Sequence, residues 1–207
     1  MKSTMEKLDL SKADKTYYKA TKKPQVVDLD AYYYLTIEGQ SAPEDPQFMD
    51  AIGAIYPIAY GIKFDLKAEG KDFTVPKMEA YWFVKGGAKS QGEFKNTPRD
   101  KWCWKILVRM PDFVESDHFF RAVAQAKEKN KSSQLDQVKF ELINEGKCAQ
   151  ILHIGSYEAE EETINTLHNF IWENGMQITG YHKEVYLSDP RRAAEDKLRT
   201  IIRYSVN

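Results

Sequence analysis

The strongest candidate for chemistry is a carboxylate beside an aromatic hydroxyl in a short segment near the C-terminus. Glu184 and Tyr186 are two residues apart in the stretch Tyr181 to Leu187, whose aromatic and β-branched residues favour a strand. Residues two apart in a strand point to the same side, so we expect Glu184 and Tyr186 to share one face, with apolar Val185 on the other, against the helices. A carboxylate among aromatic rings suits a cation or a polarised ligand. In a dry pocket its pKa would rise, which suits a general base.

A second Glu-x-Tyr pattern lies in the first half of the chain. Strand alternation would place Glu79, Tyr81 and Phe83 toward the same groove as Glu184, with Ala80 and Trp82 on the opposite side. The alternative is that both glutamates lie on an open, solvent-exposed sheet face, and the pattern alone leaves that alternative open. Further candidates for an aromatic ligand-binding wall are Tyr33, Tyr56 and Trp172.

These residues need a sheet to position them, and the order of expected elements occurs twice. Hydrophobic patterning predicts strands at 25–39, 77–84, 102–110, 138–144, 147–155, 181–187 and 197–206, and helices at 47–64, 115–130 and 158–174. The similar order and spacing in both halves indicates an internal repeat, with chance as the alternative. We therefore predict an α+β fold of duplicated strand–helix–strand–strand units. They would form one curved antiparallel sheet with the helices on one face and a central ligand groove.

The domain organisation that follows has two parts. Residues 1–24, rich in Lys and Asp, are expected to be a polar, solvated N-terminal lead-in. Residues 25–207 are expected to be a single domain made of two pseudo-repeats, at about 25–130 and 138–207. The acidic run Glu158 to Glu162 is expected to be a solvated helix start, since acidic side chains suit the positive end of a helix.

Composition narrows the class of protein. The formal net charge of −1 argues against a nucleic-acid or anionic-membrane binder, because both usually show a basic excess. The N-terminus lacks the apolar stretch of a secretory signal, and the longest apolar region, residues 51–64, is too short to cross a bilayer. Cys103 and Cys148 are expected to be reduced and buried. We therefore expect a cytoplasmic protein without a protein partner.

Other catalytic patterns are missing from the sequence. His153 and His182 have no Ser or Cys partner at a readable spacing, and neither cysteine has metal-ligand spacing with a histidine. The sequence contains no nucleophile elbow and no dinucleotide fingerprint. We therefore expect no cofactor and no metal.

Several separated motifs resemble stand-alone members of the GyrI-like small-molecule-binding family, in the same order, from about residue 25 to the C-terminus. The segment 79–83 (EAYWF) matches the family's Glu-Gly-Leu-Trp-Trp pattern only in part, with Ala80 and Tyr81 as departures. The other motifs are 102–104 (WCW), 110–114 (MPDFV), 148–157 (CAQILHIGSY), 182–192 (HKEVYLSDPRR) and 197–203 (KLRTIIR).

The resemblance implies a duplicated fold with a central pocket and a key glutamate, which is Glu184 in this sequence. It also implies that Tyr186, Trp104 and Tyr81 line the pocket. Some relatives are fused to DNA-binding domains and sense lipophilic or cationic drugs, whereas stand-alone relatives are implicated in hydrolysing cyclopropanoid DNA-alkylating compounds.

Two functions follow as expectations, both with an aromatic or lipophilic small molecule as partner. In the first, Glu184 acts as general base on a water that opens an electrophilic cyclopropane, while Tyr186 and Trp104 stabilise the developing oxygen anion. In the second, the protein binds or sequesters a lipophilic cation against Glu184 without chemistry.

Overall fold

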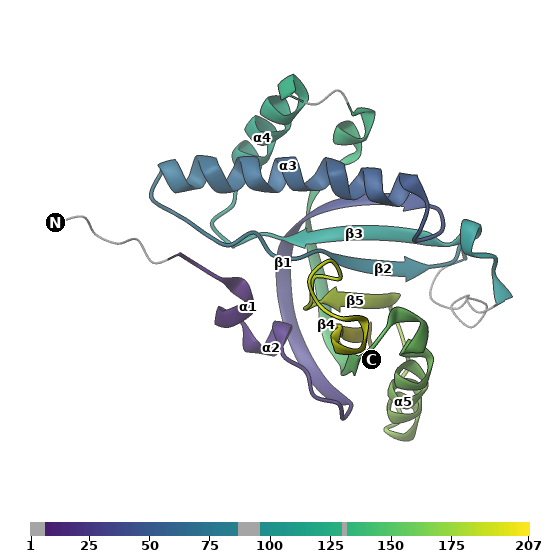
Figure 1. Ribbon diagram of the computed structural model, residues 1–207. Coiled ribbons are helices and arrows are strands. Elements are labelled where there is room, and N and C mark those ends of the chain that lie inside the picture. Colours follow the sequence, from purple (N-terminus) through teal and green to yellow (C-terminus); the bar gives the residue numbers. More distant parts are fainter. Residues whose placement is uncertain (1–6, 87–95, 130–131) are drawn as a thin grey trace.

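Six antiparallel strands form the framework of the computed structural model, which describes residues 7–86, 96–129 and 132–207 (Figure 1). The strands are β1 (Gln25–Gln40), β2 (Glu79–Phe83), β3 (Cys103–Arg109), β4 (Lys139–Ile154), β5 (His182–Tyr186) and β6 (Arg199–Ser205). The helices are α1 (Leu10–Ala13), α2 (Lys15–Tyr18), α3 (Pro46–Ala68), α4 (Ser116–Lys129) and α5 (Glu160–Glu173). Short 3₁₀ turns lie at Arg99–Lys101, Ser133–Gln137, Tyr157–Ala159 and Glu195–Lys197.

The sheet closes on itself in the order β1-β3-β2-β5-β6-β4. The predicted α+β class with an antiparallel sheet is confirmed; the sheet closes into a barrel, which the predicted single curved sheet did not include. Closure depends on the two longest strands. β1 pairs with β4 over residues 25–36 and with β3 over residues 34–40, and β4 likewise pairs with both β1 and β6.

One expected turn does not occur. Glu145 and Gly146 were expected to separate two strands, but β4 runs continuously through both and keeps a constant register against β1. Gly146 has φ +59°, in the left-handed region that glycine enters without steric cost. The turn signal therefore marks a local distortion of one long strand and not a reversal of the chain.

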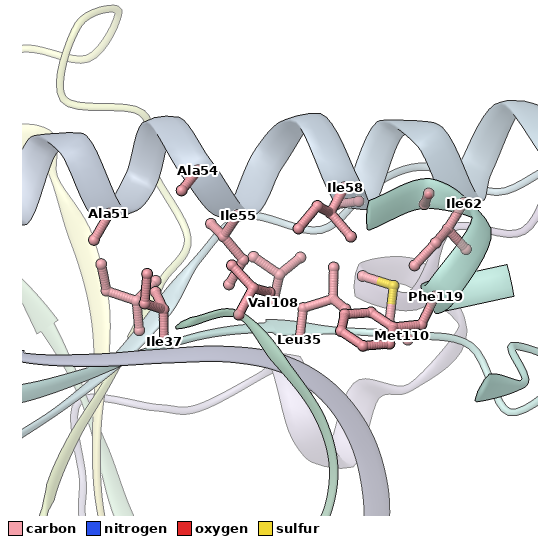
Figure 2. Packing of buried hydrophobic residues seen from close by; sticks show 14 of the residues in the cluster. Leu35, Ile37, Ala51, Ala54, Ile55, Ile58, Ile62, Val108, Met110 and Phe119 are labelled. Atoms are coloured by element: carbon pink, nitrogen blue, oxygen red, sulfur yellow. The ribbon is translucent and has the colours of Figure 1, made fainter. Parts of the chain in front are cut away.

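Helix α3 begins as the sequence indicates. The Asp45 side chain accepts a hydrogen bond from the Gln47 N–H, and Pro46 occupies the first helical turn. Its apolar side packs on β1 and β3, where residues such as Ile55 and Ile58 meet Leu35 and Val108 (Figure 2). Burial of these aliphatic side chains, each worth about 1.5–3 kcal/mol, fixes the helix on the sheet.

The sheet has two buried faces, which we call outer and inner. The outer face carries α3 and α4 over one half and α5 over the other. The inner face is covered by the N-terminal segment with α1 and α2 (Figure 1). Leu10, Tyr17 and Tyr18 are buried there, so the expectation of a solvated lead-in is wrong for this stretch. Residues 1–6 of that lead-in lie outside the described residues.

Two further expectations concern burial. Cys103 and Cys148 are both buried and free, as predicted. Within the described ranges, no helix combines the length and the apolar character needed to cross a membrane.

Candidate functional site

The seam between β2 and β5 decides which predicted residues can meet. Directly paired residues put their side chains on the same face, and Ala80 pairs with Glu184 while Trp82 pairs with His182. Glu184 and Tyr186 therefore share the outer face, as their spacing predicted. That face carries the helices, however, so the expectation that Glu184 lies opposite the helices is wrong.

The predicted site residues of β2 lie on the opposite face of the sheet from Glu184. Glu79 pairs with Val185, and Tyr81 pairs with Lys183, so Glu79, Tyr81 and, by strand alternation, Phe83 lie on the face opposite to Glu184. The prediction that they share one groove with Glu184 is wrong. Glu79 and Tyr81 belong to a separate polar centre, and Phe83 stacks on Tyr181 with ring centroids 4.4 Å apart.

The outer face holds a group of polar side chains that we call the Glu184 cluster: Glu160, His182, Glu184, Tyr186 and Tyr204. His182 connects its members, because Nε2 lies 3.0 Å from Glu184 Oε1 and Nδ1 lies 2.7 Å from the Tyr204 hydroxyl. The Glu184 side chain is 12% exposed, so it is partly shielded and still within reach of a ligand.

Two tyrosine hydroxyl groups, of Tyr186 and Tyr157, lie near this carboxylate. The Trp82 indole N–H donates to the Tyr186 hydroxyl at 3.3 Å, and the Tyr157 ring lies edge-on to the Tyr186 ring. Burial, followed by the charge of Glu184, raises the Tyr186 pKa well above its ordinary value of 10. The same two causes raise the pKa of Tyr157 to about 12. Both hydroxyls therefore stay protonated at neutral pH and can donate hydrogen bonds.

Glu160 is a site residue that the sequence interpretation missed. It was expected to be solvated, but it is 4% exposed and its Oε1 atom is buried without a hydrogen-bond partner. Burial, then the charges of Glu184 and Glu158, raise the pKa of Glu160 to about 10. A signal existed in the sequence: Glu160 precedes Ile164, Leu167 and Ile171 by four, seven and eleven residues, which places it on the apolar side of α5.

The cluster has the donor set of a metal site. One side-chain ligand atom each from Glu160, His182 and Glu184 lie within 4.8 Å of one another. Carboxylate and imidazole donors suit first-row divalent metal ions.

A second polar centre, which we call the inner network, lies on the opposite face of β5. Lys183 is 1% exposed, and its ammonium is 2.7 Å from Glu145 Oε2 and 2.9 Å from Glu79 Oε2. It also donates to the Tyr17 hydroxyl at 2.9 Å. Arg203 completes the network by donating to Gln150 and to the Tyr17 carbonyl.

The inner network is balanced in charge and closed to ligands by the chain itself. Two cations, Lys183 and Arg203, face two carboxylates, Glu79 and Glu145, and Tyr17 from α2 fills the space above them. A buried pair of this kind is costly to disrupt, because removing one partner leaves an uncompensated charge. We assign this network a structural role. Glu79, predicted to bind ligand, is one of its members.

The remaining predicted residues do not gather at Glu184. Trp104 is 1% exposed under α3, and its N–H already donates to Ser41 Oγ at 2.9 Å. Tyr33 stacks on Phe140, at the β1–β4 pair. Trp172 is 62% exposed on α5 beside His168. Tyr56 of α3 is half-buried, and its hydroxyl donates to the Pro76 carbonyl.

Two surface hollows lie away from the Glu184 cluster. One is bordered by Thr36, Glu38 and Lys139, on β1 and β4, and the other by Gln40 and Lys101. The central ligand groove therefore stays a prediction.

Comparison with known proteins identifies relatives of the chain. The sequence profile of the GyrI-like small molecule binding domain matches residues 106–205. An uncharacterized conserved protein from Listeria innocua has 32% identity and a TM-score of 0.87, with 97% of this chain and 100% of that chain covered. No protein with a curated functional description matches the chain significantly.

Two further solved structures extend this comparison. A hydrolase from Listeria innocua has 30% identity and a TM-score of 0.83, again with 97% of this chain and 100% of the other covered. The C-terminal domain of EcmrR has 12% identity and a TM-score of 0.56 over 89% of this chain and 97% of that domain. The second likeness concerns the fold alone.

Proposed function

Because the chain belongs to the GyrI-like small-molecule-binding family, we propose that it binds aromatic or lipophilic small molecules at the Glu184 cluster and hydrolyses an electrophilic cyclopropane within them. The observation that carries this proposal is the setting of Glu184: a partly shielded carboxylate with neutral aromatic donors beside it. The relative described as a hydrolase supports the reaction class.

The proposed reaction adds one water to the strained ring. Glu184 takes a proton from the water, and the water oxygen bonds to a ring carbon. The carbon–carbon bond of the cyclopropane breaks, and its electron pair moves through the conjugated system onto a carbonyl oxygen. That oxygen then takes up a proton as a phenol. A positioned base contributes roughly 10²–10⁴ in rate, which suffices for a ring already activated by strain.

Aromatic hydroxyl groups would stabilise the developing phenolate. Tyr186 is the donor adjacent to Glu184 on the same strand, and the Trp82 N–H orients its hydroxyl. Preorganised donors in a dry site are worth more than the same donors in water. Trp82 takes the part expected of Trp104, whose N–H is already bound to Ser41.

The test is turnover of a cyclopropanoid probe, followed by mass spectrometry as the gain of one water. We expect wild type to convert the probe and Glu184→Gln to be slower by roughly 10²–10⁴. Glu162→Gln changes the same charge at an exposed position of α5 and serves as the matched control. Equal rates for wild type and Glu184→Gln would exclude Glu184 as the base.

The alternative function is binding of a lipophilic cation without chemistry. The observation that favours it is the lack of a cationic partner for the Glu184 cluster: within the described ranges, no Lys or Arg lies at ion-pair distance from Glu184 or Glu160. Calorimetry with a cationic dye tests it. Binding that survives both Glu184→Gln and Glu160→Gln undiminished would eliminate the charge-pairing explanation.

A further inference from the structure

We propose that Glu160, His182 and Glu184 form a binding site for a divalent first-row transition metal ion, with Zn²⁺ as the best match to the donor set. The site coincides with that of the proposed function, and the inference rests on that function only for the role of the ion. It revises the expectation, drawn from sequence spacing, that the protein has no metal.

The first observation is the convergence of three ligands from two elements. His182 and Glu184 lie two residues apart on β5 and therefore share a face, and Glu160 comes from the first turn of α5. Their ligand atoms lie within 4.8 Å of one another. Ligands of a bound Zn²⁺ lie about 2.0–2.2 Å from the ion, so small side-chain rotations would close the set around it.

The second observation is the unmatched carboxylate. Glu160 is 4% exposed and its Oε1 atom has no hydrogen-bond partner. Within the described part of the chain, no Lys or Arg forms an ion pair with Glu160 or Glu184. His182 is at ion-pair distance from Glu184. Buried carboxylates are normally paired or coordinated to metals. A divalent cation at this point would compensate the charge of both side chains in their carboxylate forms.

The third observation is the orientation of His182. Its Nδ1 is 2.7 Å from the Tyr204 hydroxyl, which leaves Nε2 directed at Glu184 Oε1, 3.0 Å away. A metal-binding histidine typically uses one ring nitrogen for the ion and hydrogen-bonds the other to a nearby group that fixes the ring. Tyr204 is placed to be that group.

Three protein ligands leave an open coordination position, as in catalytic zinc sites. An ion held there would lower the pKa of its bound water to about 7. It would therefore supply the hydroxide for ring opening, while Tyr186 remains beside the site as hydrogen-bond donor. In this arrangement Glu184 would hold the ion, so bulk solvent would take the proton of the water in place of Glu184, and the water oxygen would bond to the ring carbon with the same ring opening and protonation of the carbonyl oxygen.

The experiment uses the full-length protein, stripped with a chelator and titrated with Zn²⁺ in a calorimeter. We expect one equivalent to bind, Tyr204→Phe to weaken affinity by about 10–100-fold, and Glu160→Gln and His182→Gln to weaken it more. Glu162→Gln should bind as wild type does. The proposal would be overturned if wild type bound less than one equivalent of Zn²⁺, or if wild type and Glu160→Gln bound it with equal affinity. Thermal melting of each variant verifies that it is folded.

X-ray absorption at the zinc edge provides a readout independent of activity. The expected first shell contains nitrogen and oxygen at about 2.0–2.2 Å, whereas sulfur at about 2.3 Å would indicate binding at Cys103 or Cys148 and would overturn the proposal. The two proposals fail separately. Turnover in stripped protein that binds no Zn²⁺ removes the metal and keeps Glu184 as base. Bound Zn²⁺ without turnover keeps the metal site and removes the hydrolase.

Discussion

Lys183 and Glu184 are consecutive residues of β5 whose charged groups lie on opposite faces of one sheet. The Lys183 ammonium is 2.7 Å from Glu145 in the inner network, and the Glu184 carboxylate is 3.0 Å from His182 in the Glu184 cluster. One five-residue strand thus connects the structural centre of the fold with its candidate site.

Removing the inner cation should destabilise the protein strongly. Lys183→Met leaves Glu79 and Glu145 facing each other without Lys183, so we expect a loss of about 3–5 kcal/mol in the free energy of unfolding. Urea denaturation measures it. Lys147→Met makes the same change at an exposed position of β4 and should stay within about 0.5 kcal/mol of wild type. A loss below about 1 kcal/mol for Lys183→Met would contradict the structural role.

Acid should weaken the inner network through Glu145. Burial alone would raise the pKa of this carboxyl, but Lys183 and Arg203 outweigh burial and hold it below the ordinary value of 4.5. A folded-state pKa that is depressed contributes stability above the unfolded value, and this contribution is lost as pH falls through the folded value. Melting temperatures should therefore fall more steeply below pH 4.5 for wild type than for Glu145→Gln. Parallel curves would show that Glu145 does not titrate with unfolding.

Two glycines should respond to alanine in opposite directions. A Cβ atom at Gly39 would lie 2.2 Å from the Trp104 ring, whereas at Gly53, on the exposed side of α3, it would meet nothing within 4 Å. We expect Gly39→Ala to cost about 1–3 kcal/mol through overpacking. Gly53→Ala should gain about 0.5–1 kcal/mol from helix propensity. Thermal denaturation of both variants measures these changes in stability. An unchanged melting temperature for Gly39→Ala would show that Trp104 can move aside.

The hydroxyl of Tyr186 should matter more for turnover than for folding. Tyr186→Phe keeps the ring and removes the proposed donor to the developing oxygen anion, so we expect kcat to fall by about 10²–10³. Tyr60→Phe removes a hydroxyl from the exposed side of α3 and should leave kcat unchanged. Wild-type kcat in Tyr186→Phe would assign the stabilisation to another group. Circular dichroism of both variants verifies that neither change acts through the fold.

Sequence patterning identified most of the strands, the three long helices and the shared face of Glu184 and Tyr186, because strand alternation depends only on local geometry. It could not tell which face meets the helices. The prediction assumed that apolar Val185 marks the helix side, but the inner face is equally buried, under α1 and α2. Strands buried on both faces lose the apolar–polar alternation on which such an inference depends.

The ion-pair partners of the buried charged residues also could not be predicted from the sequence. Lys183 and Glu145 are 38 residues apart in the chain, and β4 and β5 are not neighbours in the sheet. Both strands pair with β6, and the ion pair exists because this strand order brings the two side chains onto one face. Closure depends on the length of β1 and β4, and the turn signal at Gly146 concealed that length. Glu160, by contrast, could have been found from its helical phase with Ile164 and Leu167.

Side chains on β5 alternate between the two faces, so a slip of this strand by a single position would exchange the ammonium and the carboxylate. The Glu184 carboxylate would then meet the carboxylates of Glu79 and Glu145, and the Glu184 cluster would lose that carboxylate. Insertions and deletions within His182–Tyr186 are thus barred by the fold before any selection for activity applies. Evolution can vary the ligand preference of this protein by substitution around the strand, but not by changing the strand's length.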